Sequence, residues 1–301
     1  MLGALLESLA APIAGPTFDA FWRATADTRA RHRHPTLRAA GLGARADRLA
    51  FAFAGGYVAA LSRLDPTLGP DDVAALCATE DGGAHPRAIH TTLKDGRLSG
   101  TKRFVSGGPL ATRLLVVATT GEVDGRPRLV LVRVPPTAPG VTLTTMDELP
   151  FVPELPHASV ELRDVVVTPA DVLPGDGYAD ALKPFRTLED LHVHAAVLGY
   201  LSAVARRSGW QHEARERLLA SLVTAVALGD EDPRAAGTHL ALAGVLATTR
   251  ALVHELAPLW AKAPADEAAR FERDRPLLDV AAKAREARRL KAWETLSRSG
   301  T

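Results

Sequence analysis

The period of the hydrophobic pattern changes twice along this chain, and few folds are compatible with both changes. Up to about residue 74 apolar residues recur with helical spacing, in a stretch rich in alanine. From there to about residue 182 short apolar runs alternate with turn residues, and from Phe185 onward the helical spacing returns. Because side chains repeat about every 3.6 residues in a helix and every second residue in a strand, each change marks a boundary. We predict an α+β fold of three domains: an N-terminal helical domain over residues 1–74, a β-barrel domain over 75–182 and a helical bundle over 183–301.

The middle region contains segments that predict strands. Leu114–Ala118 and Leu129–Val132 are short apolar runs, and Val160–Val167 begins with the alternation of a half-buried strand. Gly125 and Pro139 mark turns between such segments. Several short strands at these intervals are typical of a barrel or sandwich, and we predict a central antiparallel β-barrel.

The last region predicts long amphipathic helices. Apolar residues between Leu242 and Leu256 share one helix face. A second face is predicted over Leu277–Ala287, with Pro276 in the first turn of its helix. Long helices with short links favour an antiparallel four-helix bundle.

Composition excludes several classes of protein. With 36 basic and 35 acidic residues the net charge is +1, so we expect no broad surface for nucleic acid or an anionic membrane. The single cysteine, Cys77, excludes an internal disulfide, suits a reducing cytoplasm and is expected in a buried strand. Met1–Ala14 is apolar but carries Glu7 and has no basic leader, which predicts a short helix and not a signal peptide. No uninterrupted apolar run approaches the ~20 residues of a membrane span.

Two short segments in the middle region carry the clearest chemistry. The first is Thr79–Gly83, and the second, about twenty residues later, is Gly100–Gly108. A strand edge with backbone amides, followed by a hairpin bearing an aromatic residue and a hydroxyl two positions later, can lie against a flat polar ring. The order, spacing and residue types resemble the flavin-binding β-domain of acyl-CoA dehydrogenases, where the segments run approximately T-E-P-G-A-G-S-D and N-G-x-K-x-W-I-T-N-G.

The resemblance continues beyond these segments. Val160–Pro169 is similar to the family's V-x-F-x-D-V-x-V-P strand, and Ala195–Gly199 to the A-A-x-x-L-G of its first bundle helix. It implies the family's helical–β–helical fold, FAD as cofactor, and α,β-dehydrogenation of an acyl thioester carried by CoA or an acyl-carrier protein. The resemblance implies that five residues contact the isoalloxazine ring of FAD: Ala78, Thr79, Phe104, Val105 and Ser106. Among these, Phe104 matches the stacking tryptophan, and Ser106 matches the threonine near flavin N5.

The resemblance also assigns a catalytic base. In part of the family the base lies on the first bundle helix, ten residues before the glycine of that motif; counting back from Gly199 gives Glu189. The role requires a carboxylate of raised pKa that accepts the proton of the α-carbon. The alternative is structural, because an acidic residue near a helix start interacts favourably with the helix dipole.

Two other clusters of titratable residues suggest weaker hypotheses. His192 and His194 are two residues apart, about 200° round a helix, so one face cannot offer both to a metal, and no metal is expected. The alternating arginines and histidines of residues 29–38 predict a solvated surface, with contact to a nucleotide phosphate as the minor alternative.

The sequence departs from the family pattern in places that concern the rest of FAD. Ala84–His85 and Pro86 replace the Gly-Ser and Asp of the phosphate-contacting loop, and Asp190 stands where an arginine is usual. Beyond the position of Thr301 the family continues with a segment that holds the adenosine half of FAD and with a catalytic loop. We therefore expect a shortened, divergent member, dimeric or paired with a related subunit, that binds FAD weakly or with a partner's help. The alternative is a non-redox member that binds acyl thioesters or serves as the inactive subunit of a hetero-oligomer.

Overall fold

The structure, a computed structural model, describes residues 12–299. The chain divides into two compact units. The helical unit contains the residues up to Ala60, Pro150–Glu154 and those from Thr187 onward, and the sheet unit contains Leu61–Leu149 and Leu155–Arg186. Helices from opposite ends of the sequence therefore belong to one unit. The helix predicted over Met1–Ala14 falls outside the described residues except at residues 12–14, which are not helical.

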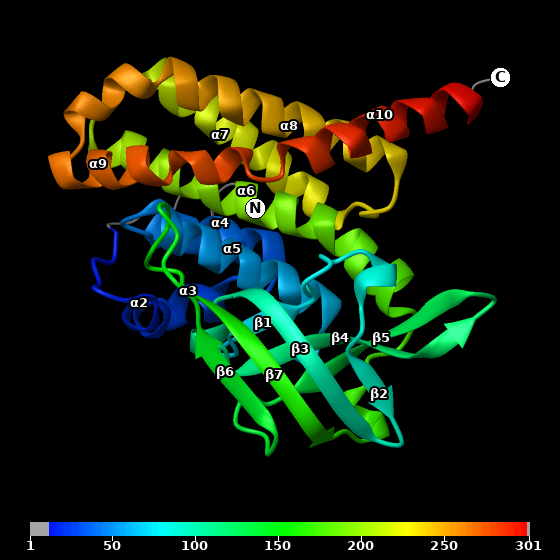
Figure 1. Cartoon of the computed structure of the whole chain (residues 1–301). Helices are drawn as coiled ribbons and strands as arrows, with labels where there is room; N and C mark the ends of the chain where they lie inside the picture. Colours follow the sequence, from blue (N-terminus) through cyan, green and yellow to red (C-terminus); the bar gives the residue numbers. More distant parts are fainter. Residues whose placement is uncertain (1–11, 300–301) are drawn as a thin grey trace. The chain divides into compact units, whose positions relative to one another are not determined.

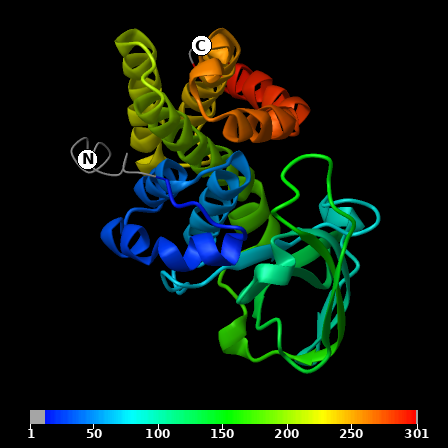
Figure 2. The ribbon, with the colours of Figure 1, turned by 90° about the vertical axis from the view of Figure 1, so that its left-hand side faces the viewer.

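The helical unit is built from α-helices and short 3-10 turns (Figures 1 and 2). Its N-terminal helices are α2 (Phe18–Ala24), α3 (Ala26–Arg31), α4 (Pro35–Arg45) and α5 (Leu49–Leu64). Its later elements are α6 (Lys183–Arg207), α7 (His212–Ala227), α8 (Ala236–Glu255), η6 (Ala257–Lys262), α9 (Ala265–Asp274), η7 (Arg275–Asp279) and α10 (Ala282–Ser299).

A glycine lets α6 approach α4 closely. A Cβ atom on Gly199 would lie 2.2 Å from the carbonyl oxygen of Ala40, a distance that no side chain tolerates. Gly199 therefore permits a short distance between α6 and α4 that a larger residue would prevent.

The apolar face predicted for α8 is confirmed. The second apolar face, predicted over Leu277–Ala287, is wrong. Leu242, Val245 and Val253 are buried on α8. The chain from Arg275 to Asp279 is instead a 3-10 helix, α10 starts only at Ala282, and Val280 is 67% exposed. The reason is that α10 turns another face inward, with Ala292 buried and two arginines paired to α6.

By length and composition α8 alone among the described helices would suffice to cross a membrane. Many core helices of soluble proteins meet the same criterion, so this property does not identify a span.

The sheet unit holds seven strands. They are β1 (Ala74–Cys77), β2 (Thr92–Lys94), β3 (Arg97–Ser106), β4 (Arg113–Val123), β5 (Arg126–Val134), β6 (Val141–Thr145) and β7 (His157–Val166). The runs that predicted strands lie in β4, β5 and β7, which is confirmed. Between β4 and β5, Asp124 and Gly125 both have positive φ, as a two-residue hairpin turn of the primed type requires.

The sheet is mixed and open, and so differs from the antiparallel barrel expected from the sequence. The pairing order is β1-β4-β2-β3-β7-β6, with β5 added beside β4, and within residues 12–299 no pairing joins β5 to β6. β1 and β2 both run parallel to β4. The β2–β3 hairpin reverses the chain once, and the link from β3 to β4 reverses it again, so β4 has the direction of β2. The strands curve about a core that includes Cys77, Leu98, Val116 and Val160 (Figures 1 and 2). Burial raises the pKa of the Cys77 thiol to about 12, which confirms a buried, unreactive cysteine.

Candidate functional site

A buried ion pair joins the two segments that the sequence singled out. Lys102 on β3 has no exposed surface, and its Nζ lies 2.6 Å from Oε1 of Glu80. Glu80 also accepts hydrogen bonds from the backbone amides of His90 and Thr91 and from the Thr91 hydroxyl. Burial raises the pKa of the Glu80 carboxyl, but the hydrogen bond and charge of Lys102, together with the hydrogen bonds from His90 and Thr91, hold that pKa below its usual value. The Glu of the first segment and the Lys of the second are therefore partners.

Gly100 makes room for this network. Its φ is 152°, and a Cβ atom there would lie 2.4 Å from Oγ1 of Thr91. Thr91 can reach Glu80 only because β3 has no side chain at this point. Three residues of the two motifs, Glu80, Gly100 and Lys102, thus serve to assemble the site.

Phe104 is displayed by a strained backbone. The register between β3 and β7 shifts between Lys102 and Val105, and within this bulge Phe104 has a φ of 53°. A bulky residue in the left-handed region costs about 1–2 kcal/mol. The bulge leaves the ring 55% exposed beside the exposed Arg103, while Lys102 and Val105, which flank these two residues, stay buried. The ring is therefore exposed on a strained backbone, and the Arg103 guanidinium lies 5.9 Å from its centre.

The five residues expected to hold the flavin ring lie in the sheet unit, just after β1 and at the end of β3. The Arg103 amide donates to the Thr79 carbonyl at 2.8 Å, which brings the end of β1 beside the bulge of β3. Ala78 and Val105 are buried, so they can offer only backbone groups to a ligand, whereas Thr79 and Ser106 are half-buried. The patch therefore offers an apolar ring, two hydroxyl groups and backbone polar groups.

His157 belongs to this patch and was missed at the level of the sequence. It pairs with Ser106 across β3 and β7, and its Nε2 lies 3.1 Å from the Ser106 Oγ. Burial lowers the pKa of His157, although a hydrogen bond with the Leu155 backbone partly opposes this, so the imidazole is neutral at neutral pH. A neutral imidazole fixes the direction of the Ser106 hydroxyl without adding a charge. No spacing in the sequence connects these residues, which are 51 positions apart.

Glu189 lies in the helical unit, on α6. The helix begins at Lys183 and follows a π-helical turn over Gly177–Leu182, so Glu189 lies in its second turn. This is one turn beyond the helix start, where the interaction with the helix dipole is weaker. Glu189 is half-buried.

Asp190, about 100° round α6 from Glu189, has a structural role. It is 6% exposed and forms ion pairs with Arg285 at 2.8 Å and Arg288 at 2.5 Å, both on α10. This carboxylate therefore attaches α10 to α6.

The two histidines of α6 form hydrogen bonds with different partners. His192 contacts the Leu188 carbonyl and the Thr36 hydroxyl, whereas Nδ1 of His194 donates to the Asp190 carbonyl. In residues 12–299 no three potential metal-ligating residues of His, Cys, Asp or Glu gather.

The predicted solvated basic surface is wrong in part. Arg29 and His32 are buried, and the Arg29 guanidinium lies over the Trp22 ring at 4.2 Å. The hydrophobic period did not reveal this, because the arginine packs through its flat face on an aromatic ring.

Comparison with known proteins identifies the fold. No protein-family model and no curated protein matches the sequence. Solved structures match over most of the chain. The prolyl acyl carrier protein oxidase AnaB is 17% identical, with a TM-score of 0.67 over 93% of this chain and 90% of its own. PigA in complex with FAD is 13% identical, with a TM-score of 0.66 over 92% and 90%. Butyryl-CoA dehydrogenase from Megasphaera elsdenii is 12% identical, with a TM-score of 0.63 over 94% and 99%.

The chain has the fold of the acyl-CoA dehydrogenases. The match extends over most of both chains in each comparison, so it is confined neither to the sheet nor to the helices. The family resemblance noted from the motifs is confirmed at the level of the fold.

Within this acyl-CoA dehydrogenase-like fold the patch around Phe104 presents an exposed phenyl ring with half-buried hydroxyl groups on the same two segments. A flat heteroaromatic ring can stack on the exposed Phe104 side chain and meet polar groups of Thr79 and Ser106 at its edges. At the position of the phosphate loop, His85 is exposed and its Nδ1 accepts from the Arg87 amide. The residues of the ring half therefore fit FAD better than those of the phosphate half.

One sequence feature could have revealed the ion pair. Leu98, Gly100 and Lys102 are spaced by two and so share one face of β3, with Leu98 in the core. A lysine on an inward face needs an acidic partner.

Proposed function

We propose that this protein is an FAD-dependent oxidoreductase that removes hydrogen from the α and β carbons of an acyl thioester. The observation that supports this most strongly is the strained, exposed Phe104 beside the hydroxyl groups of Thr79 and Ser106. Backbone strain persists where the surrounding structure holds it, and here the buried Lys102 and Val105 flank the exposed pair of Arg103 and Phe104.

In this proposal the sheet unit binds and orients the cofactor. Phe104 stacks on the ring, Thr79 and the backbone of Ala78 and Val105 meet its polar edge, and Ser106 directs its hydroxyl toward it. A bound flavin supplies the oxidant that accepts the hydride leaving the β-carbon. His157 keeps the Ser106 hydroxyl in one direction, because the contact of 3.1 Å ties the two side chains together.

Glu189 is proposed to accept the proton that leaves the α-carbon of the thioester. The support is its place on one continuous helix, ten residues before the close-packed Gly199. A carboxylate is suited to this step when its surroundings raise its pKa toward neutrality. The neighbouring Asp190 is unsuited, because two arginines already neutralise it.

The carrier and the assembly are also proposals. An acyl-carrier protein is a proposed carrier, since AnaB is by its name an oxidase of a prolyl acyl carrier protein, and CoA is the alternative, as in butyryl-CoA dehydrogenase. We propose a homodimer, or a heteromer with a related subunit that completes the phosphate half of the FAD site. A reducing, cytoplasmic setting agrees with the lone buried thiol of Cys77.

The test combines cofactor binding with reduction. The purified protein is titrated with FAD, and binding is followed by calorimetry and by the visible absorbance band of oxidised flavin. The loaded protein is then mixed without oxygen with a chain-length series of acyl thioesters on CoA and on an acyl-carrier protein. We expect saturable FAD binding and loss of the visible band with at least one thioester.

Each outcome has a defined meaning. Absence of FAD binding, alone or with a coexpressed related subunit, would overturn the flavin proposal. FAD binding without reduction by any thioester would favour the non-redox alternative. A Phe104→Ala variant that binds FAD as tightly as the natural protein would contradict the stacking role, since base–aromatic stacking is worth about 1–3 kcal/mol.

A further inference from the structure

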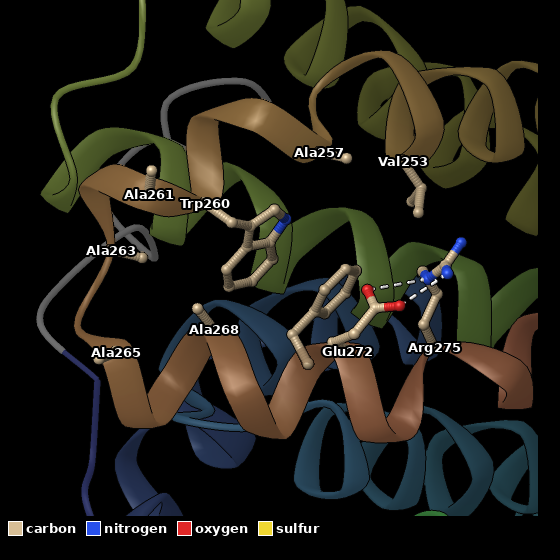
Figure 3. A pocket seen from close by; sticks show the side chains of 10 residues that line it. Val253, Ala257, Trp260, Ala261, Ala263, Ala265, Ala268, Glu272 and Arg275 are labelled. Carbon is tan, nitrogen blue, oxygen red and sulfur yellow. Dashed lines mark hydrogen bonds and ion pairs between the residues drawn. The ribbon is translucent and has the colours of Figure 1, made fainter.

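The helical unit contains a hollow that the proposed chemistry does not use. A cavity of about 440 Å³ lies between the end of α8, η6 and α9 (Figure 3). Its wall includes five alanines, whose small side chains leave the space open: Ala257, Ala261, Ala263, Ala265 and Ala268. Trp260 and Phe271 line the same cavity, stacked with ring centroids 4.1 Å apart. Its volume lies within the range of small-molecule sites, and apart from Glu272 and Arg275 the residues that line it are apolar.

A second, smaller cavity adjoins the first and is basic. It measures about 230 Å³, and Val253 and Arg275 line both cavities. Arg250 and Arg285 line the second cavity as well, with Asp279 as the acidic residue of its wall. The apolar and the basic cavity therefore have two lining residues in common.

Not all of these arginines are committed to protein partners. Arg285 is held by Asp190 and the Leu278 carbonyl, so it contributes a fixed positive charge. Arg250 makes one ion pair, at 2.9 Å to Asp279, and both side chains are more than 60% exposed. Exposed pairs of this kind are weak, and a guanidinium has five N–H donors, so Arg250 can bind a second anion. Arg275 likewise pairs with Glu272 at the exposed edge of the first cavity.

The field in the second cavity favours an anion. His194 lines this cavity. Burial of the imidazole and, to a smaller extent, the charge of Arg285 lower the pKa of His194 to about 4, so the ring is neutral at neutral pH. Arg250 acts in the same direction and Asp190 in the opposite one, and the outcome is an imidazole that does not take up a proton. The wall thus carries three arginines, Arg250, Arg275 and Arg285, against the single carboxylate of Asp279.

We propose that the two cavities form one binding site for an amphipathic organic anion, with a hydrocarbon tail against the alanines and Trp260 and a carboxylate or phosphate at Arg250. The residues of this site belong to the helical unit, whereas those of the flavin-ring patch belong to the sheet unit. Binding at this site requires neither FAD nor a thioester, so the proposal can be tested independently of the proposed function.

Three probes of equal tail length test the proposal by calorimetry: octanoate, octan-1-ol and octylammonium. The apolar cavity should bind the tail of each, but the basic cavity should favour octanoate over the alcohol and disfavour the cation. Arg250→Gln should weaken octanoate about tenfold, the size of a lost charge-assisted hydrogen bond, and leave the alcohol unchanged. Ala268→Leu fills the apolar cavity and should weaken both.

A matched control removes the same charge elsewhere. Arg217 forms an exposed pair with Glu255 and lines neither cavity, so Arg217→Gln should leave octanoate binding unchanged. Circular dichroism checks folding, and Ala261→Leu, at an exposed alanine, replaces Ala268→Leu if that variant misfolds. Octylammonium binding as tightly as octanoate would overturn the anion site. Octanoate affinity that survives both leucine variants would place the tail elsewhere and overturn the apolar half.

Discussion

Replacement of Lys102 by methionine tests whether the two motifs are held together by charge. Methionine keeps the length and apolar stem of lysine but removes the ammonium. In the variant Glu80 would keep its hydrogen bonds from the His90 amide and from the amide and hydroxyl of Thr91, but would lose its counter-ion. Breaking one side of a buried pair costs about 3–5 kcal/mol. Because three of four hydrogen bonds remain, we expect a loss near the lower end, about 3 kcal/mol.

The cost should depend on pH and on the partner. Without the ammonium the pKa of Glu80 rises, so protonation relieves the unpaired charge and the difference from the natural protein shrinks as the pH falls through the carboxyl range. Glu80→Gln together with Lys102→Met removes both charges. The double variant should lose about 1–3 kcal/mol less than the sum of the single variants, because the two side chains are in direct contact.

The assay must report on the sheet unit. All four tryptophans, Trp22, Trp210, Trp260 and Trp293, belong to the helical unit, so tryptophan fluorescence reports on that unit. We would therefore measure amide hydrogen exchange of peptides from β3 and β4 as a function of urea. Lys94→Met on β2 is the control, since Lys94 is exposed and the change should stay within about 0.5 kcal/mol. A loss below about 1 kcal/mol for Lys102→Met, or strict additivity with Glu80→Gln, would refute the pairing.

Three further predictions concern function and pH. Phe104→Gly relieves the positive φ, so it should be about 1 kcal/mol more stable than Phe104→Ala in urea unfolding, while both lose FAD affinity; equal stabilities would show that the bulge carries no strain. Glu189→Gln should keep FAD but slow flavin reduction about 10²–10⁴-fold in stopped-flow absorbance, with Glu216→Gln as control; near-normal rates would remove Glu189 as the base. The lowered pKa of His194, about 4 against 6.5, means that the unfolded chain takes up a proton which the folded chain does not, so stability falls as the pH drops from 6.5 to 4. The loss reaches about 3 kcal/mol, and His194→Gln should flatten this part of the stability profile; an unchanged slope would contradict the neutral, buried imidazole.

The sequence by itself determined the elements whose evidence is local. The apolar runs of β4 and β5, the turn at Gly125 and the buried face of α8 depend on residues within a few positions of one another. Periodicity and turn chemistry act over that range, and the order and spacing of the two motifs were enough to identify the fold.

The tertiary structure decided what depends on distant contacts. The sequence predicted an antiparallel barrel, but pairing β1 with β4 in parallel requires knowing where the chain returns. No pattern in the sequence pairs Lys102 with Glu80 or Ser106 with His157. The residues of each pair are far apart in the sequence and come into contact only in the folded sheet unit. The cost of a buried charge or a strained φ is set by the surroundings that exclude water and fix the backbone, and those surroundings come from every part of the unit.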